Sequence, residues 1–278
     1  MRVAAVGDIH AGIDHDSADR LRQGWAHLAD HADVLLLAGD LTRCGEPQEA
    51  RVVADAIDRA DLATVAVLGN HDLHAGQGAE VVDILESVGV AVVEGGGAVL
   101  DVAGGRVGVA GVKGFGGGFE GACVSDFGED ETKAFARHTI DVASRLRFAL
   151  AGLDDADARI ALLHYSPVRD TLRGEPSELY PFLGSYLLAE AVDAVGADLV
   201  VHGHAHRGSE RGVTPGGIRV RNVAQPVIRS AYRVFEFPRS TGRRLRSKDR
   251  RNASPRGARM GVSGLEEVDA ELPDHARE

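Results

Sequence analysis

Short apolar runs alternate with amphipathic segments along the first third of the chain, and this alternation constrains the fold most. The run at 34–38 is apolar throughout, as expected of a strand buried on both faces. We expect strands at 2–6, 34–38 and 64–68, and helices at 16–30, 46–60 and 79–88. This order predicts right-handed crossovers and a largely parallel sheet with helices on its face.

Helix-start signals support two of these helices. Asp16 or Ser17 is expected to cap the helix at 16–30, since short polar side chains accept hydrogen bonds from the first free amides. Pro47 stands in the first turn of the next helix, where a missing amide hydrogen costs nothing.

The second part of the folded chain has a different character. Short strands separated by Gly-rich turns predict an antiparallel meander at 90–93, 98–102 and 106–110. Beyond it we expect a long helix at 131–151, a helix ending near 195, and strands at 159–163, 198–201, 218–223 and 231–237. Two sheets packed face to face, each covered by helices, accommodate these elements best.

The pattern stops after residue 237. Residues 239–259 are rich in Arg, Ser and Gly, and 266–278 are acidic, so neither stretch offers enough apolar surface to offset the entropy of ordering. We therefore expect one domain at 1–237 and a charged, mostly disordered C-terminal tail at 238–278.

Composition narrows the classes of function. The formal net charge of −11 disfavours a broad nucleic-acid-binding surface. No apolar run approaches a membrane span and the first residues do not look like a secretory leader, so we expect a cytoplasmic protein that does not bind membranes. Cys44 and Cys123 are expected to be free thiols, which leaves nitrogen and oxygen ligands for any metal.

Polar residues follow the predicted strands, where ligands bind in open α/β sheets. Each motif alone fits a turn, a helix cap or a buried histidine. Together, two carboxylates and several imidazoles at one rim need a compensating cation. These side chains suit Mn, Fe, Zn or Co, and there are enough of them for two ions if one carboxylate bridges. The motifs contain Asp8 and His10, Asp40, Asn70 with His71 and Asp72, His164, and finally His202, His204 and His206.

The ordered set D-x-H, G-D, G-N-H-D, H and G-H-x-H is complete between residues 7 and 206. It resembles the calcineurin-like metallophosphoesterase superfamily, and most of all its bacterial branch of small-molecule phosphodiesterases. The resemblance implies a four-layer α/β/β/α sandwich of two mixed sheets that carries a dinuclear centre of two divalent ions.

The resemblance also implies a role for each motif residue. Asp8, His10 and His206 would hold one ion, Asn70, His164 and His204 the other, and Asp40 would bridge both. A hydroxide activated by the two ions would attack phosphorus. His71 would stabilise the developing charge or protonate the leaving group, with Asp72 orienting its ring. His202 precedes the motif and is expected to support the site.

Substrate choice is harder to assign from the residues. The Gly-rich stretch 113–128 matches neither nucleotide-binding fingerprint and is interpreted as a mobile rim or a connector. The segment 165–185 leaves His164 directly, and its Arg169 and Arg173 either bind a second phosphate or carboxylate or are solvated loop charges.

We therefore expect a metal-dependent phosphoesterase acting on a small-molecule phosphodiester, such as a cyclic nucleotide, or on a phosphomonoester. Two alternatives stay open: a nuclease of the same superfamily, for which the Arg-rich stretch 239–259 is the sequence support, and a non-catalytic scaffold that keeps the fold.

Overall fold

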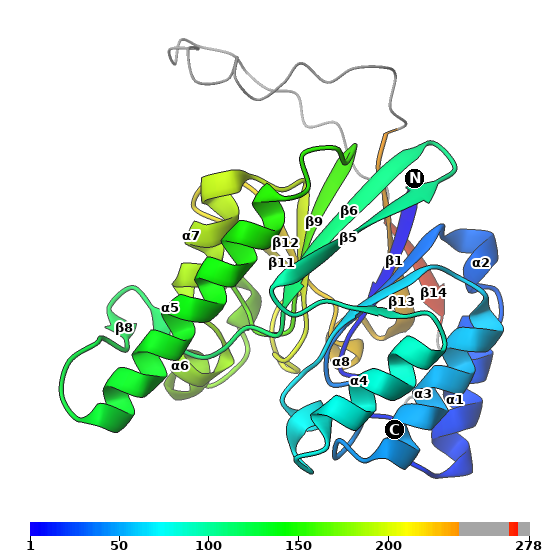
Figure 1. Ribbon diagram of the computed structural model, residues 1–278, viewed down its shortest axis with the longest axis horizontal. Helices are drawn as coiled ribbons and strands as arrows, with labels where there is room; N and C mark the ends of the chain where they lie inside the picture. The colour runs from blue at the N-terminus through cyan, green and yellow to red at the C-terminus, as the bar shows by residue number, and fades with distance from the viewer. Residues whose placement is uncertain (239–266, 272–278) are drawn as a thin grey trace.

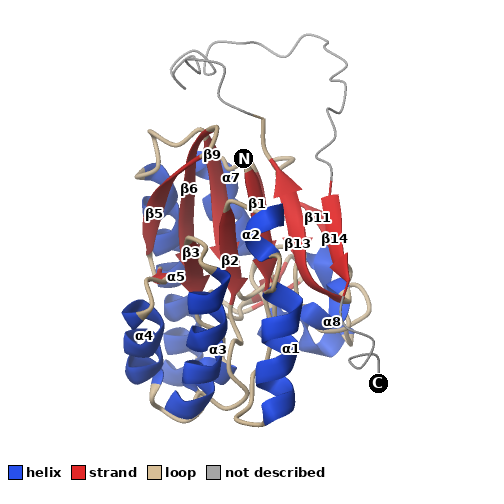
Figure 2. Cartoon of the chain, turned by 90° about the vertical axis from the view of Figure 1, so that its right-hand side faces the viewer, coloured by secondary structure: helices blue, strands red, loops and turns tan. Residues whose placement is uncertain are grey.

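Two six-stranded sheets lie face to face, and helices cover the outer face of each (Figures 1 and 2). This arrangement is seen in a computed structural model that describes residues 1–238 and the backbone of 267–271. The expected α/β/β/α sandwich of two mixed sheets is confirmed.

The first sheet has the strand order β14-β13-β1-β2-β3-β4. The four strands β1 to β4 are parallel to one another. Strand β13 runs antiparallel to β1, and β14 runs antiparallel to β13. The strands are β1 (Arg2–Val6), β2 (Val34–Ala38), β3 (Thr64–Val67), β4 (Ala91–Val92), β13 (Ser230–Glu236) and β14 (Glu267–Glu271). Its outer face is covered by α1 (His15–Trp25), α3 (Pro47–Ala60) and α4 (Gly78–Ser87).

The second sheet has the order β11-β12-β10-β9-β6-β5, with four parallel strands between two antiparallel edges. Its strands are β5 (Gly96–Val102), β6 (Gly105–Val112), β9 (Ala158–Leu163), β10 (Leu199–His202), β11 (Arg211–Val213) and β12 (Arg219–Asn222). The long α5 (Asp130–Ala151) and α7 (Tyr186–Val195) pack on its outer face (Figure 1).

Alternating side chains of each strand serve different layers, as the two-residue period of a strand requires. In β1, Val3 and Ala5 face the second sheet, whereas Ala4 and Val6 face the helices. The buried apolar residues between the sheets come from strands of both, and they fix the two sheets against each other.

Two predicted elements are corrected by the structure. The run at 90–93 does not begin a meander: β4 pairs in parallel with β3 in the first sheet, because it follows the crossover helix α4. The predicted helix 16–30 is broken into α1 and α2 (Leu28–His31), and the cap of α1 is Asp14, which accepts a hydrogen bond from Ser17 N at 2.8 Å.

The remaining elements are short. The Gly-rich stretch contains a small hairpin of β7 (Gly118–Phe119) and β8 (Ala122–Cys123). Short 3-10 turns and one-turn helices lie in the loops: η1 (His71–Leu73), η2 (Arg169–Leu172), η3 (Ser177–Leu179), α6 (Tyr180–Leu183) and α8 (Gln225–Ile228). Both cysteines are free thiols, as expected. Within residues 1–238 and 267–271, none of the helices has both the length and the apolar character needed to cross a membrane.

The segment expected to be a tail is described only in part. Strand β14 lies within it and extends the first sheet beyond β13. Residues 239–266 and 272–278 lie outside the described part of the chain, so the division at residue 237 stays a prediction.

Candidate metal centre

The carboxyl ends of parallel strands from both sheets meet at one edge of the sandwich. Asp8 follows β1, Asp40 follows β2 and Asn70 follows β3 in the first sheet. His164 follows β9 and His204 follows β10 in the second. The predicted ligands are therefore brought together although they come from five separate loops.

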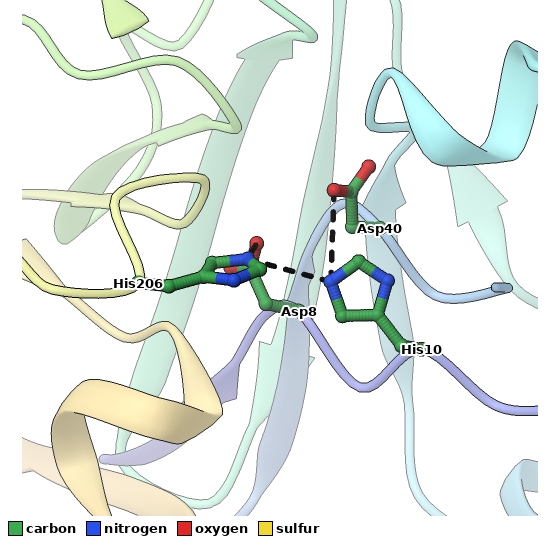
Figure 3. A group of neighbouring side chains, drawn as sticks. All are labelled: Asp8, His10, Asp40 and His206. Atoms are coloured by element: carbon green, nitrogen blue, oxygen red, sulfur yellow. Dashed lines mark hydrogen bonds and ion pairs between the residues drawn. The ribbon is translucent and has the colours of Figure 1, made fainter. Parts of the chain in front are cut away.

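The first group of side chains is Asp8, His10, Asp40 and His206, whose ligand atoms all lie within 4.8 Å of one another (Figure 3). His206 Nε2 is 2.8 Å from Asp8 Oδ1 and 3.4 Å from His10 Nε2. His10 Nε2 is in turn 3.8 Å from Asp40 Oδ2. Two imidazole nitrogens and two carboxylates thus point at one small volume.

The second group is Asp40, His164 and His204, again within 4.8 Å. Asn70 joins it through its Oδ1, which is 3.0 Å from His164 Nε2. Asp40 belongs to both groups, and its Oδ1 is 3.3 Å from His164 Nε2. One buried carboxylate therefore stands between two clusters of potential ligands.

The donor set fits a cation. His164 Nδ1 donates to the Ala38 carbonyl at 2.8 Å, so in the neutral ring Nε2 carries a lone pair. That lone pair faces the buried carboxylate of Asp40 and the partly exposed amide oxygen of Asn70. Acceptors that converge without water need a proton or a metal ion between them.

Charge and burial oppose each other strongly here. Burial opposes ionisation of Asp40, but the charge of His164 and hydrogen bonds from His164 and the His71 amide outweigh it and hold its pKa well below the usual range. Burial likewise opposes charge on His164, yet Asp40 raises the His164 pKa to about 9. Burial and the nearby His164 lower the pKa of His204 to about 3, which favours the neutral ring that binds metals.

Backbone conformation marks the same residues. Four of the predicted ligands have a positive φ, in the left-handed region that residues other than glycine rarely adopt. They are Asp8 at 56°, His10 at 47°, Asp40 at 50° and His204 at 70°. Of seven predicted ligands four are held this way, at roughly 1–2 kcal/mol each. Such strain is typical of functional sites, because the surrounding fold must maintain it.

The motif glycines are explained by close approach. A Cβ on Gly69 would collide with Asp40 Oδ1, and one on Gly203 would collide with Asp8 Oδ2. Because Gly69 and Gly203 have no side chain, the carboxylate of Asp40 can pack against the loop after β3 and the carboxylate of Asp8 against the loop after β10. The His204 amide also donates to both oxygens of Asp8, at 3.0 and 2.9 Å.

His71 lies at the rim, with its ring against that of His10 at 4.6 Å between centroids. Its Nδ1 donates to the Arg43 carbonyl at 2.8 Å, which directs Nε2 toward Asp40 Oδ2, 3.9 Å away. The group that orients the ring is thus a backbone carbonyl, and no contact between the side chains of His71 and Asp72 is seen among the described residues.

Asp72 is fully buried and joins two loops. Its Oδ1 accepts from the amide and the hydroxyl of Thr42 at 2.8 and 2.6 Å, and its Oδ2 accepts from the amides of Gly69 and Leu41 at 2.8 and 3.2 Å. These contacts hold the loop after β2 against the loop after β3. A catalytic role for Asp72 stays a prediction, and its contacts are those of a structural group.

His202 is buried beside the site. Its Nε2 is 2.8 Å from Thr171 Oγ1 and its Nδ1 is 2.7 Å from the Gly203 carbonyl, while burial lowers its pKa to about 4. It belongs to neither ligand group.

The two predicted substrate residues lie on η2 and beside it. Arg169 lies over the Tyr180 ring, 5.8 Å from its centroid, and donates to the Glu120 carbonyl at 3.4 Å. Arg173 is largely exposed and is paired with the half-buried Asp170 at 2.6 Å. Among residues 1–238 no hydrogen bond or ion pair connects either arginine to the ligand groups.

Two neighbours of the centre were missed by sequence reasoning. Tyr165 packs its ring on that of His204, with centroids 4.2 Å apart. The Lys113 ammonium lies 4.9 Å from the same Tyr165 ring. Lys113 directly follows β6 and so obeys the strand-end rule, but its place in a Gly-rich stretch obscured that signal.

Comparison with known proteins agrees with this site. The model of the calcineurin-like phosphoesterase family matches residues 1–208. No curated protein matches the chain significantly.

Three solved structures share the fold. Phosphopantetheinyl hydrolase from Mycobacterium tuberculosis is 17% identical with a TM-score of 0.59, over 80% of this chain and 88% of that one. GAP50, the anchor in the inner membrane complex of Plasmodium, is 13% identical with a TM-score of 0.53, over 86% and 81%. A candidate 5'-nucleotidase from Staphylococcus aureus is 16% identical with a TM-score of 0.50, over 84% of this chain and 49% of that one.

The chain belongs to the calcineurin-like phosphoesterase family, because the family model covers most of it and all five motifs converge at one edge. It is therefore placed among the metal-dependent phosphoester hydrolases, and its cluster of His and Asp side chains has the composition of a metal site.

Proposed function

We propose that this protein hydrolyses small-molecule phosphoesters, either diesters or monoesters, with two divalent metal ions at the strand-end cluster. Asp8, His10 and His206 would hold one ion, Asn70, His164 and His204 the other, and Asp40 both. The observation that carries the proposal is the membership of one buried carboxylate in two groups of converging acceptors.

When bound, two divalent ions neutralise phosphate charge and lower the pKa of water, which supplies a nucleophile near neutral pH. Mn, Fe, Zn and Co all suit imidazole, carboxylate and amide ligands. The chain's part is to orient the ligands, which the carbonyl of Ala38 does for His164 and the His204 amide does for Asp8.

His71 is proposed to act on the substrate. Its ring is half exposed, its Nδ1 proton is fixed on the Arg43 carbonyl, and its Nε2 is directed to the side of Asp40. A proton held at Nε2 would stabilise charge on the phosphoryl group or pass to the leaving oxygen.

The small-molecule class is supported by charge. The net charge of −11 opposes binding along a nucleic-acid backbone. A phosphopantetheinyl hydrolase shares the fold and, at 17% identity, supports the fold alone. The fold is also shared by GAP50, which is described as an anchor, so the intact ligand set and not the fold alone supports catalysis.

The test is Mn²⁺-dependent hydrolysis of an aryl phosphodiester beside the matching monoester, with Asp40→Asn as the matched variant. Asn keeps the size of the side chain and tolerates the left-handed backbone at this position. Turnover that requires the metal and is lost in Asp40→Asn supports the proposal. Failure of the metal-loaded wild-type protein to hydrolyse either ester contradicts it and leaves the scaffold alternative.

A further inference from the structure

Lys113 stands at the same edge as the candidate ligands. It follows β6, which pairs in parallel with β9, and Val112 lies opposite Leu163 in that register. The amides of His164 and Tyr165 both donate to the Lys113 carbonyl, each at 3.0 Å. The backbone of Lys113 is therefore fixed directly beside a candidate metal ligand.

The ammonium of Lys113 is held by two aromatic rings. Its Nζ lies 4.9 Å from the ring centroid of Tyr165 and 5.2 Å from that of Phe115, within the range of cation–π attraction. It donates to the Gly114 carbonyl at 3.1 Å. An ammonium has three donors, and within residues 1–238 no carboxylate forms an ion pair with this one.

The rings relate this cation to the second ligand group. The Tyr165 ring packs on His204 at 4.2 Å and meets His164 edge-on at 5.6 Å. Lys113 is only partly buried, and no hydrogen bond or ion pair joins its side chain to the predicted ligands within the described chain. The ammonium thus lies near the second ligand group, separated from His204 by the Tyr165 ring, and it has N–H donors that are not used by the described residues.

We propose that Lys113 binds a second anionic group of the substrate, a phosphate, phosphonate or carboxylate carried on the arm that stays attached to the scissile phosphate. This inference rests on the proposed function. In the proposed function His71 and the residues that would hold the ions surround the scissile phosphate, so a cation one ring farther out would meet the next charged group of the substrate. A charge-assisted hydrogen bond from an ammonium is among the stronger polar contacts.

The nearby arginines are less suited to this part. Arg173 is already paired with Asp170, and Arg169 contacts a carbonyl and the Tyr180 ring. Lys113 instead has donors to spare. Its position is fixed by two rings, by two amides that donate to its carbonyl, and by the Glu94 carboxylate, which accepts from its amide at 2.6 Å.

The test uses two esters with the same scissile bond, ethyl 4-nitrophenyl phosphate and 2-phosphonoethyl 4-nitrophenyl phosphate. The measured quantity is the ratio of kcat/KM for the phosphonoethyl ester to that for the ethyl ester, at saturating Mn²⁺. Lys113→Met is compared with Lys113→Arg, which keeps the charge. Lys133→Met is the matched control, since Lys133 pairs with Asp130 on α5.

We expect the ratio to fall about tenfold or more in Lys113→Met, to stay near the wild-type value in Lys133→Met, and to be largely restored in Lys113→Arg. An unchanged ratio in a folded Lys113→Met protein that hydrolyses both esters overturns the assignment of Lys113 alone. If the wild-type protein hydrolyses neither diester, the inference is overturned, whereas the proposed function fails only if the matching monoester, 4-nitrophenyl phosphate, is also left intact. Equal loss of the ratio in Lys113→Met and Lys113→Arg would show that local shape, not charge, is responsible, and would also overturn it.

Discussion

The two halves of the candidate centre share Asp40 but differ in their contact with solvent. In the half formed by Asp8, His10 and His206, the two histidine side chains are 22% and 41% exposed. In the other half, His164 is completely buried and is fixed through Nδ1 to the Ala38 carbonyl. Both histidines of the first half are open to the surroundings, whereas the second half combines a completely buried histidine, His164, with the partly exposed Asn70 and His204.

This difference has an energetic meaning. Water can solvate His10 and His206 when no cation is present, so the exposed half tolerates loss of a ligand. His164 Nε2 and the Asp40 carboxylate have no such relief, because burial removes water from both. We infer that the buried half depends more on its cation for stability and that the exposed half exchanges its ion more readily.

The largest effect is expected for His164→Ala, which removes the central group of the buried half. We expect kcat/KM to fall by about 10³-fold or more, since several kcal/mol of charge stabilisation are lost. Steady-state kinetics across a Mn²⁺ titration measures it. Full rescue by added metal would contradict the distinction between the halves.

A smaller loss is expected for His206→Ala in the exposed half. Water can take the place of an exposed imidazole, so we expect roughly a 10²-fold loss at low Mn²⁺ that excess Mn²⁺ partly restores. The same titration provides the measurement. A loss as deep and as resistant to metal as that of His164→Ala would break the comparison.

Asp72→Ala tests the group that holds the loop of the shared Asp40 against the loop of Asn70 in the buried half. Removing the carboxylate leaves the amides of Leu41, Thr42 and Gly69 without their acceptor, and we expect the free energy of unfolding to fall by about 3 kcal/mol. Urea denaturation followed by circular dichroism checks this. Loss of turnover at unchanged stability would instead support the chemical role predicted for Asp72.

The smallest effect concerns backbone strain at His10, whose φ is 47°. In metal-free protein we expect His10→Gly to raise the free energy of unfolding by about 1 kcal/mol, because glycine adopts this conformation freely. With Mn²⁺ present the variant should be less stable than the wild type, since a ligand is missing. Thermal unfolding with and without metal shows the sign change.

Asp61→Gly is the control for that experiment, because Asp61 has the same φ of 47° at the end of α3, remote from the ligand groups. Its effect should not depend on metal. If Mn²⁺ changed the stability effect of Asp61→Gly as much as that of His10→Gly, backbone strain at the metal ligand would not explain the result.

Much of the fold could be predicted because strand, helix and strand-end signals agree in the first part of the chain. The apolar run of β2, the proline and capping box of α3, and polar residues after β1, β2 and β3 all indicate one parallel sheet. The convergence of the motifs follows from topology, whereas the role of each candidate ligand came from the resemblance to the metallophosphoesterase superfamily.

Other features depend on tertiary contacts that local patterns do not contain. The two-residue strand β4 joins the first sheet only because α4 returns it there, and the three-residue β11 exists only as a partner of β12. The role of the Arg43 carbonyl in orienting His71 leaves no trace in residue type, since any residue supplies a carbonyl. Lys113 was hidden because glycines on either side suggested a loop and not a site.

The central claim is that Asp40 serves two metal sites in one chain, and the most direct test is the number of Mn²⁺ ions bound per chain, measured by native mass spectrometry on the wild type and on Asp40→Asn at equal free metal. We predict two ions for the wild type and loss of tight binding at both sites in the folded variant. A single ion in the wild type, or two ions retained by Asp40→Asn, would contradict the account.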